Sequence, residues 1–188
     1  MRNPCRAPDR EARFTSLYEA TYAELLRFAQ RRVHATHAED VVAESFLAAW
    51  RRLDDLPPQR DDARAWLFGI VRGVVLNARR GAERQRALAV RLADVPTSLT
   101  ADVDADLIAR QIDVSRAWQH LSAVYQEALA LAVLDELSGP QAAAVLGISP
   151  IAFRLRLSRA RRALRVRLDY LSRTSSTPGH ISERTPSS

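Results

Sequence analysis

Seven arginines stand between Pro150 and Leu168, and no acidic residue interrupts them. The arginine side chain presents a planar fork of N–H donors that fits phosphate oxygens and the edges of guanine bases. The segment just before it, SGPQAAAVLGIS, carries no charged residue at all. A neutral segment followed by an arginine-rich one therefore predicts a surface that binds a polyanion.

The residues around these arginines predict how the surface is positioned. Ser138 and Gln141 have the spacing of a capping box, and Gly147 stands where the end of a helix favours a left-handed residue. Ser149 then caps a second helix, whose first position is taken by Pro150. This order predicts a helix-turn-helix whose second helix enters a major groove of DNA.

Apolar residues of that second helix recur at helical spacing and form one stripe: Phe153, Leu157, Ala160 and Leu164. The first residues of the helix would then face base edges, and the later arginines would meet phosphates. An ordinary helical hairpin with a solvated basic face is the alternative. A helix lying on a membrane surface is less favoured, because the helix has no tryptophan and its apolar stripe is narrow.

Composition limits the class of protein. The chain has 188 residues, a net charge of +6 and 47% hydrophobic residues, and all 28 basic residues are arginine. Cys5 is the only cysteine, so neither an internal disulfide nor a cysteine metal site is expected. His34, His37, His120 and His180 are scattered, without the pattern of a zinc site. We expect no catalytic residue, cofactor, metal or membrane association, and a cytoplasmic location.

The pattern of apolar residues predicts an all-α protein of two small helical domains joined by a flexible acidic linker. In the first domain, Thr36 with Glu39 predicts a capping box, and a later helix is expected over Ala63–Arg80. The expected boundaries are a disordered N-terminus (1–12), an N-terminal domain (13–92), the linker (93–112), a C-terminal domain with the helix-turn-helix (113–171) and a disordered tail (172–188).

Three segments together resemble a known family: AEDVVAESFLAAWRRLDDL, ARAWLFGIVRGVVLNARR and LSGPQAAAVLGISPIAFRLRLSRARRAL. They resemble bacterial RNA polymerase sigma factors of the sigma-70 family, of the extracytoplasmic-function (ECF) type. The resemblance covers about Phe14 to Leu168. It implies a subunit that binds core RNA polymerase, recognises and melts promoter DNA, and directs the initiation of transcription. It also implies a cognate anti-sigma factor as partner, and no stable homo-oligomer.

The resemblance assigns roles to individual residues. Contacts with the clamp coiled coil of the polymerase are expected from Asp40, Glu44, Phe46 and Arg51, and the C-terminal domain is expected to meet the flap. Contacts with the minus-ten element are expected from Arg64, Trp66, Arg72, Asn77, Arg79 and Arg80. Contacts with the minus-thirty-five element are expected from Ser149, Ile151, Ala152, Arg154, Leu155, Arg156, Arg159, Arg161 and Arg162. Phe46 and Trp66 also suit a purely structural role in the core.

The sequence departs from the family pattern at two places. Gly73 stands where the family often has asparagine, which removes one expected promoter contact. Near the start of the last helix, the run from Ala152 to Leu155 replaces a common threonine-valine-lysine-serine run. Two hydroxyl groups are lost there, and apolar contact with thymine methyl groups is the substitute that the residues offer.

Other interpretations stay open at this point. The acidic linker has Asp94, Asp102, Asp104 and Asp106, which suit either a segment threaded through the polymerase or a solvated connection. A stand-alone helix-turn-helix regulator with a helical sensor lobe would bind a palindrome as a dimer. A nuclease would use acidic residues to hold magnesium, and the candidates are Asp54, Asp55, Asp61 and Asp62.

Overall fold

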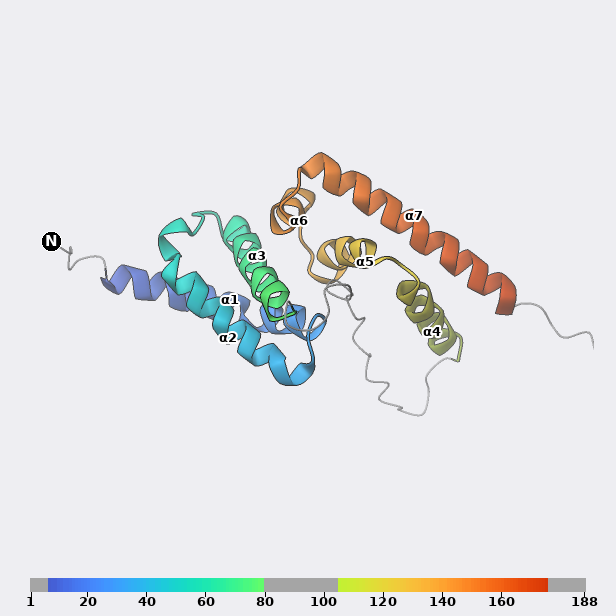
Figure 1. Ribbon diagram of the computed structural model, residues 1–188, viewed down its shortest axis with the longest axis horizontal. Helices are drawn as coiled ribbons and strands as arrows, with labels where there is room; N and C mark the ends of the chain where they lie inside the picture. Colours follow the sequence, from blue (N-terminus) through green and yellow to red (C-terminus); the bar gives the residue numbers. More distant parts are fainter. Residues whose placement is uncertain (1–6, 80–104, 176–188) are drawn as a thin grey trace, which may run out of the picture.

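The computed structural model describes residues 7–79 and 105–175, and every regular element in these two ranges is a helix (Figure 1). Three helices form the N-terminal lobe: α1 (Ala7–Gln30), α2 (Ala35–Arg51) and α3 (Arg60–Arg79). Four helices form the C-terminal lobe: α4 (Ala105–Gln119), α5 (Ala123–Leu129), α6 (Gly139–Leu146) and α7 (Pro150–Ser175). The predicted all-helical architecture is confirmed.

In the N-terminal lobe, α1 packs on α2 and α2 packs on α3. α1 begins at Ala7, so residues 7–12, expected to be disordered, are helical. Pro8 is tolerated in a first helical turn, and the carboxylate of Asp9 in that turn interacts favourably with the helix dipole. These two residues therefore allow α1 to begin earlier than its pattern of apolar residues indicates.

The starts of α2 and α3 also differ from the expected positions. The N-cap of α2 is His34, and its ring Nδ1 lies 2.9 Å from Oγ1 of Thr36. The Thr36 hydroxyl is thus engaged with the histidine, and the predicted capping box is wrong. α3 begins at Arg60 rather than Ala63, because the Ala63 N–H already bonds to the carbonyl of Gln59 over 2.9 Å.

In the C-terminal lobe, α4, α5 and α6 all pack against the long helix α7. A π-helical turn, Ala130–Leu134, follows α5 directly. α4 begins at Ala105, so the last part of the expected linker is helical, whereas its first part lies outside the described residues. α7 continues to Ser175, four residues past the expected end of the domain.

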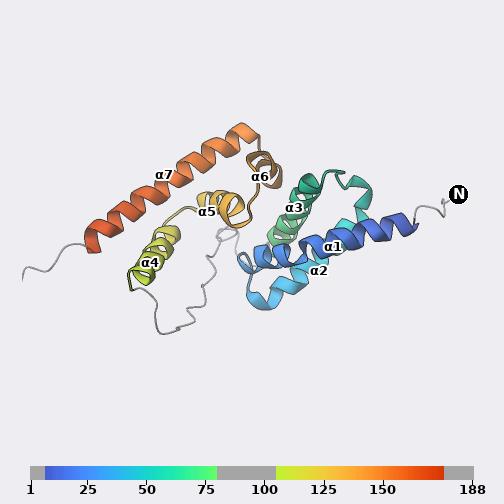
Figure 2. The ribbon, with the colours of Figure 1, turned by 180° about the vertical axis from the view of Figure 1, so that it is seen from behind.

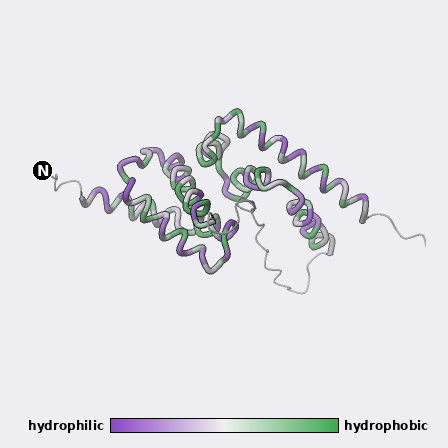
Figure 3. Tube along the Cα trace, viewed as in Figure 1, coloured by the Kyte–Doolittle hydropathy of each residue, from purple (hydrophilic) through white to green (hydrophobic). Residues whose placement is uncertain are grey.

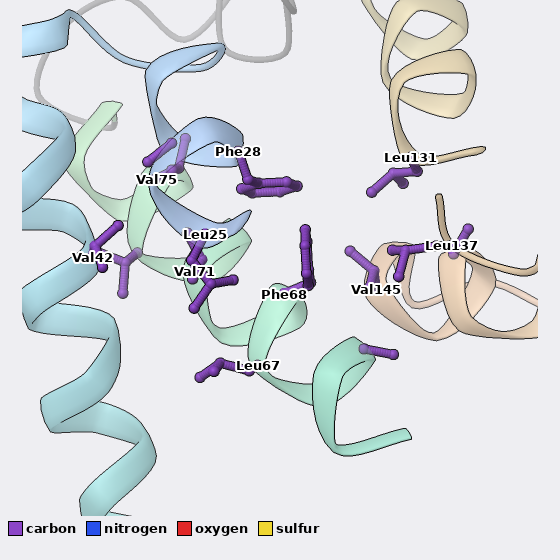
Figure 4. Packing of buried hydrophobic residues seen from close by; sticks show 14 of the residues in the cluster. Leu25, Phe28, Val42, Leu67, Phe68, Val71, Val75, Leu131, Leu137 and Val145 are labelled. Carbon is purple, nitrogen blue, oxygen red and sulfur yellow. The ribbon is translucent and has the colours of Figure 1, made fainter. Parts of the chain in front are cut away.

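The two lobes share one hydrophobic core. Viewed from both sides, α3 lies next to α6, and α4 stands at the far end of the molecule (Figures 1 and 2). The rings of Phe28 and Phe68 are fully buried, and their centroids are 5.0 Å apart. Both rings belong to a core that includes Leu131, Leu137 and Val145 of the C-terminal lobe (Figure 4). Independent lobes were expected, so this shared core is a finding that only the structure supplies.

Candidate nucleic-acid interface

The turn between α6 and α7 has the contacts of a helix-turn-helix. At the start of α6, the Ser138 N–H donates to Oε1 of Gln141 over 2.8 Å, as the capping box requires. α6 ends at Gly147, whose φ of 66° lies in the left-handed region. At the start of α7, the Ala152 N–H donates to Oγ of Ser149 over 3.2 Å. All three turn signals predicted from the sequence are therefore confirmed.

α7 has a buried face and a basic face along its length. Phe153 and Ala160 are fully buried, and Leu157 and Leu164 pack beside them, so the predicted apolar stripe is confirmed. Hydrophilic and hydrophobic residues alternate along the helix (Figure 3). The residues predicted to contact the minus-thirty-five element are exposed, apart from half-buried Arg156: Ser149, Ile151, Ala152, Arg154, Leu155, Arg159, Arg161 and Arg162.

The exposed face of α7 changes in chemistry along the helix. Ile151 and Leu155 are large apolar residues near its start, with exposed fractions of 62% and 54%. A shallow groove of about 550 Å³ follows, with four arginines among its lining residues: Arg154, Arg161, Arg162 and Arg165. Apolar side chains suit thymine methyl groups, and exposed guanidinium groups suit phosphates and guanine edges. The face can therefore bind a duplex along its major groove.

A second surface lies on α2 and is acidic and aromatic. Asp40, Glu44 and Arg51 are exposed, whereas Phe46 is buried, with a ring centroid 4.6 Å from that of Tyr18. A groove of about 550 Å³ runs beside these carboxylates, and its lining includes Asp40, several aromatic rings and Leu47. Phe46 thus forms part of the floor of the groove. Sequence reasoning missed the groove itself, because three of its five rings come from α1.

The connection between α2 and α3 is held in place by two arginines. Arg10 of α1 donates to Oδ1 of Asp54 over 2.8 Å and to the carbonyl of Trp50 over 2.7 Å. Arg52 pairs with Asp55 over 3.2 Å. Two of the four aspartates proposed for magnesium are therefore engaged with arginine. Within residues 7–79 and 105–175, no group of three or more potential metal ligands comes together.

The residues predicted for the minus-ten element lie along α3 but face different surroundings. Asn77 is exposed, and Trp66 is half-buried against the core, with the guanidinium of Arg52 5.9 Å from its ring centroid. The side chain of Arg79 and the whole of Arg80 lie outside the described residues. The structure therefore leaves both roles of Trp66 open.

Arg64 and Arg72 are engaged with carboxylates and with the C-terminal lobe. Arg64 Nε donates to Glu24 over 2.5 Å, and its Nη2 donates to the carbonyl of Asp135 over 2.7 Å. Arg72 Nε donates to Oε1 of Glu127 over 2.9 Å. The acceptors Glu127 and Asp135 were not singled out from the sequence, although both are acidic residues inside a mainly apolar segment.

Two further arginines, Arg31 and Arg32, meet the same C-terminal acceptor. Both form ion pairs with the carboxylate of Asp135, with a distance of 3.3 Å for the Arg32 pair. The Arg32 guanidinium also lies over the ring of Phe28, 3.4 Å from its centroid. Burial lowers the pKa of Arg32 to about 10, against the opposing effect of the nearby carboxylates Asp135 and Glu127. Arg32 therefore stays protonated at neutral pH.

Two family models match the chain, one in each lobe. Residues 17–85 match Sigma-70 region 2, and residues 111–164 match Sigma-70, region 4. In the part of the chain that the structure describes, no helix is long and apolar enough to cross a membrane.

Relatives and solved structures give the same result over most of the chain. The ECF RNA polymerase sigma factor SigL of Mycobacterium tuberculosis is 31% identical over 161 residues, which is 85% of this chain and 90% of the relative. RNA polymerase sigma factor CnrH of Cupriavidus metallidurans is 35% identical over 149 residues, which is 71% of this chain and 74% of the relative.

Two solved complexes share the fold. CnrH in complex with the cytosolic domain of CnrY has a TM-score of 0.57 and 30% identity, covering 85% of this chain and 90% of that one. The sigma factor RpoE in complex with the anti-sigma factor NepR from Bartonella quintana has a TM-score of 0.58 and 27% identity, covering 83% of this chain and 96% of that one. A stand-alone regulator with a sensor lobe is not favoured, because both lobes match sigma regions. The chain therefore belongs to the ECF RNA polymerase sigma factors of the sigma-70 family.

Proposed function

We propose that this sigma factor binds core RNA polymerase through α2, holds the melted minus-ten element with α3 and reads the minus-thirty-five element with α7. The observation that carries the proposal is the exposed basic face of α7, presented by a helix-turn-helix whose caps and left-handed glycine are all in place. The protein acts by differential binding of duplex and melted DNA rather than by catalysis. It works in the cytoplasm, beside the polymerase and the chromosome.

Docking on the polymerase uses the acidic and aromatic surface of α2. Asp40 and Glu44 are exposed one helical turn apart, so both carboxylates lie on one side of the helix. Arg51 is exposed at the end of α2, and Phe46 supports the groove from below. This combination suits a helical partner with basic and apolar side chains, as the clamp coiled coil offers. The C-terminal lobe makes the second contact, with the flap.

Minus-ten recognition uses side chains of α3 and the loop before it. Extruding a base from the stack costs a few kcal/mol, so phosphate contacts and stacking must offset that loss. Arg64, Arg72, Arg79 and Arg80 supply the cations, Asn77 supplies an amide for hydrogen bonding, and Trp66 supplies an aromatic ring. A groove of about 940 Å³ between α1 and the loop is lined by Pro57, Pro58 and Arg64, among others, and could receive a base.

Minus-thirty-five recognition uses the N-terminal end of α7. Ile151 and Leu155 contact thymine methyl groups, and Arg154 donates to base edges. The later arginines bind phosphates and set the register of the helix in the groove.

Two further proposals follow from the family. CnrH and RpoE were solved with CnrY and with the anti-sigma factor NepR, and we propose that this chain also has a cognate anti-sigma factor. Of the linker aspartates, Asp94, Asp102 and Asp104 lie outside the described residues, and Asp106 is in the first turn of α4. We propose that the linker threads through the polymerase near the path of the nascent RNA.

The decisive experiment is run-off transcription with purified core polymerase, with and without this chain, on fragmented DNA of the source organism. Discrete start sites that require the added chain support the proposal, and aligning the upstream sequences then gives both promoter elements. If no start site appears while the chain alone protects a symmetric duplex site, the proposal is wrong and a dimeric regulator is right.

A further inference from the structure

A groove of the N-terminal lobe, here called the aromatic groove, is lined by five rings from α1 and α2: Phe14, Tyr18, Tyr22, Phe46 and Trp50. Its volume of about 550 Å³ is that of a site for a small molecule. The ring centroids of Tyr18 and Phe46 are 4.6 Å apart, and those of Phe14 and Trp50 are 5.1 Å apart. The rings therefore form one continuous aromatic lining.

The rings of this groove meet at steep angles. Phe14 stands edge-on to Phe46 and to Trp50, with interplanar angles of 85° and 77°. Tyr18 is 40% exposed, whereas Phe46 is buried at the floor. Because neighbouring rings face different directions, the groove has walls, and a compact ligand in it meets more than one ring.

The charge of the aromatic groove is negative. Glu39 and Asp40 are both exposed and both line it, and none of the described residues that line it is basic. An aromatic ring has a negative face, so rings and carboxylates attract the same kind of group. The groove therefore favours a cation, and above all one with a weakly hydrated, apolar surface that can lie against the rings.

Two other sites in the molecule support this interpretation. The guanidinium of Arg10 lies over the ring of Trp50, 5.2 Å from its centroid, so one ring of the groove already accepts a cation. A groove of about 500 Å³ beside α7 also contains two tyrosines, Tyr125 and Tyr170, but all of its charged lining residues are arginines. The sign of the charge beside the rings, and not the presence of rings, distinguishes the two grooves.

We propose that the aromatic groove binds a small organic cation with an apolar surface, a quaternary or alkylated ammonium compound. The ammonium group lies against the rings around Tyr18, and Glu39 and Asp40 supply the opposite charge. The site itself does not depend on the proposed function. It shares Asp40 with the surface that we assign to the polymerase, so a bound cation excludes a docking helix from the groove.

The test compares choline with neohexyl alcohol, which has the same shape and a carbon atom in place of the charged nitrogen. Backbone amide shifts in the isotope-labelled full chain report both the affinity and the place of binding. Choline should shift amides around Tyr18 and Asp40 with a Kd of roughly 1 mM, as expected for a ligand of few atoms. The alcohol should bind about tenfold more weakly, because it lacks the attraction to rings and carboxylates.

Two results of this comparison would overturn the proposal. Equal affinities for choline and the alcohol would show that the groove recognises apolar surface and not charge. An absence of shifts around Tyr18 and Asp40 at about 50 mM choline would show that no cation site exists there.

Substitutions separate the rings from the carboxylates. Tyr18→Leu keeps an apolar side chain and should weaken choline binding about fivefold, and Asp40→Asn should weaken it about threefold. The matched control is Tyr170→Leu, which removes a 60% exposed tyrosine from the arginine-lined groove and should leave choline binding unchanged. Equal losses with Tyr18→Leu and Tyr170→Leu would contradict the site. Circular dichroism checks the fold, and if Tyr18→Leu is unfolded, Asp40→Asn and the uncharged alcohol still decide.

Binding to core RNA polymerase is measured separately, with about 20 mM of either probe, well above the expected Kd for choline, and with sodium chloride added to the alcohol to equalise ionic strength. Weaker polymerase binding with choline alone would show that the two partners share the groove. Unchanged polymerase binding beside bound choline would mean that the proposed docking on α2 is wrong, whereas the cation site stands. Failure to bind polymerase without any probe would refute the proposed function only.

Discussion

Arg32 and Asp135, 103 residues apart in the chain, form an ion pair of 3.3 Å in which the two side chains are 4% and 1% exposed. Because neither charge reaches water, each depends on the other for its solvation. The same carboxylate also pairs with Arg31, so one residue of the C-terminal lobe joins two residues of the other lobe. The ion pairs between the lobes thus use very few carboxylates, beside the apolar contacts of the shared core.

Replacing Asp135 with alanine should lower the free energy of unfolding by about 3 kcal/mol, the usual cost of leaving a buried charge unpaired. Urea denaturation followed by circular dichroism measures the change. Asp54→Ala is the comparison, since it removes an ion pair with Arg10 in which the aspartate is 76% exposed, and should cost less than about 1 kcal/mol. Equal losses in the two variants would contradict the importance that we give to burial.

Gly147 should not tolerate a side chain. Its φ of 66° costs roughly 1–2 kcal/mol for any residue with a Cβ, so Gly147→Ala should lower the melting temperature and weaken binding to a minus-thirty-five duplex. Gly73→Ala is the matched control, because an added Cβ there meets no atom within 4 Å and alanine favours the helix by about 1 kcal/mol. The two substitutions should therefore shift the melting temperature in opposite directions.

Arginines at different points of α7 should differ in the kind of binding that they support. Arg154→Ala should relax the base preference at one position of the minus-thirty-five element, at a cost of about 1–3 kcal/mol. Arg162→Ala should weaken binding to all duplexes alike. It should also reduce the slope of log affinity against log salt concentration by about one. Fluorescence anisotropy on a set of single-base duplex variants, repeated at several salt concentrations, distinguishes the two. Identical behaviour of both variants would refute the division of the helix into base-reading and phosphate-binding parts.

The carboxylates of α2 should matter to polymerase binding and not to stability. Asp40→Asn combined with Glu44→Gln should weaken binding to core polymerase about tenfold, because two rim charges that attract a basic partner are lost. The melting temperature should stay within about 2 °C, since both residues are exposed. Glu19→Gln, exposed on α1, should leave the affinity unchanged. A tenfold loss with Glu19→Gln as well would point to the general charge of the lobe instead.

The helix-turn-helix was predictable because its signals are local. The bond from the Ser138 N–H to Gln141, the φ of Gly147 and the Ser149 cap each depend on residues at most three positions apart. Helix starts were predicted less well. α1 begins before its first strongly apolar residue, because an acidic side chain and a tolerated proline extend a helix without any apolar pattern.

The contact between the lobes could not be predicted, because periodicity shows which face of a helix is apolar but not which other face covers it. Glu127 and Asp135 look like solvated charges until Arg72 and Arg32, 55 and 103 residues away, are placed beside them. Their presence inside the mainly apolar segment from Tyr125 to Leu137, which also holds the exposed Glu136, was the one available signal. For the same reason, Arg64 and Arg72 were predicted for DNA without the carboxylates that hold them here.

The π-helical turn Ala130–Leu134 makes the position of Asp135 tolerant of the loss of one residue. The Asp135 N–H bonds to the carbonyl of Ala130, five residues earlier, over 2.9 Å, so this turn holds one residue more than an α-helical turn. Deleting a single residue here would convert the turn to α-helical spacing and leave Asp135 at nearly the same angle about the helix axis, because five residues of a π-helical turn cover about the same rotation as four residues of an α-helix. Its carboxylate would still face Arg32, and α6, Gly147 and α7 would keep their own caps and turn. A one-codon deletion in this turn would thus preserve both the DNA-reading unit and the link between the lobes.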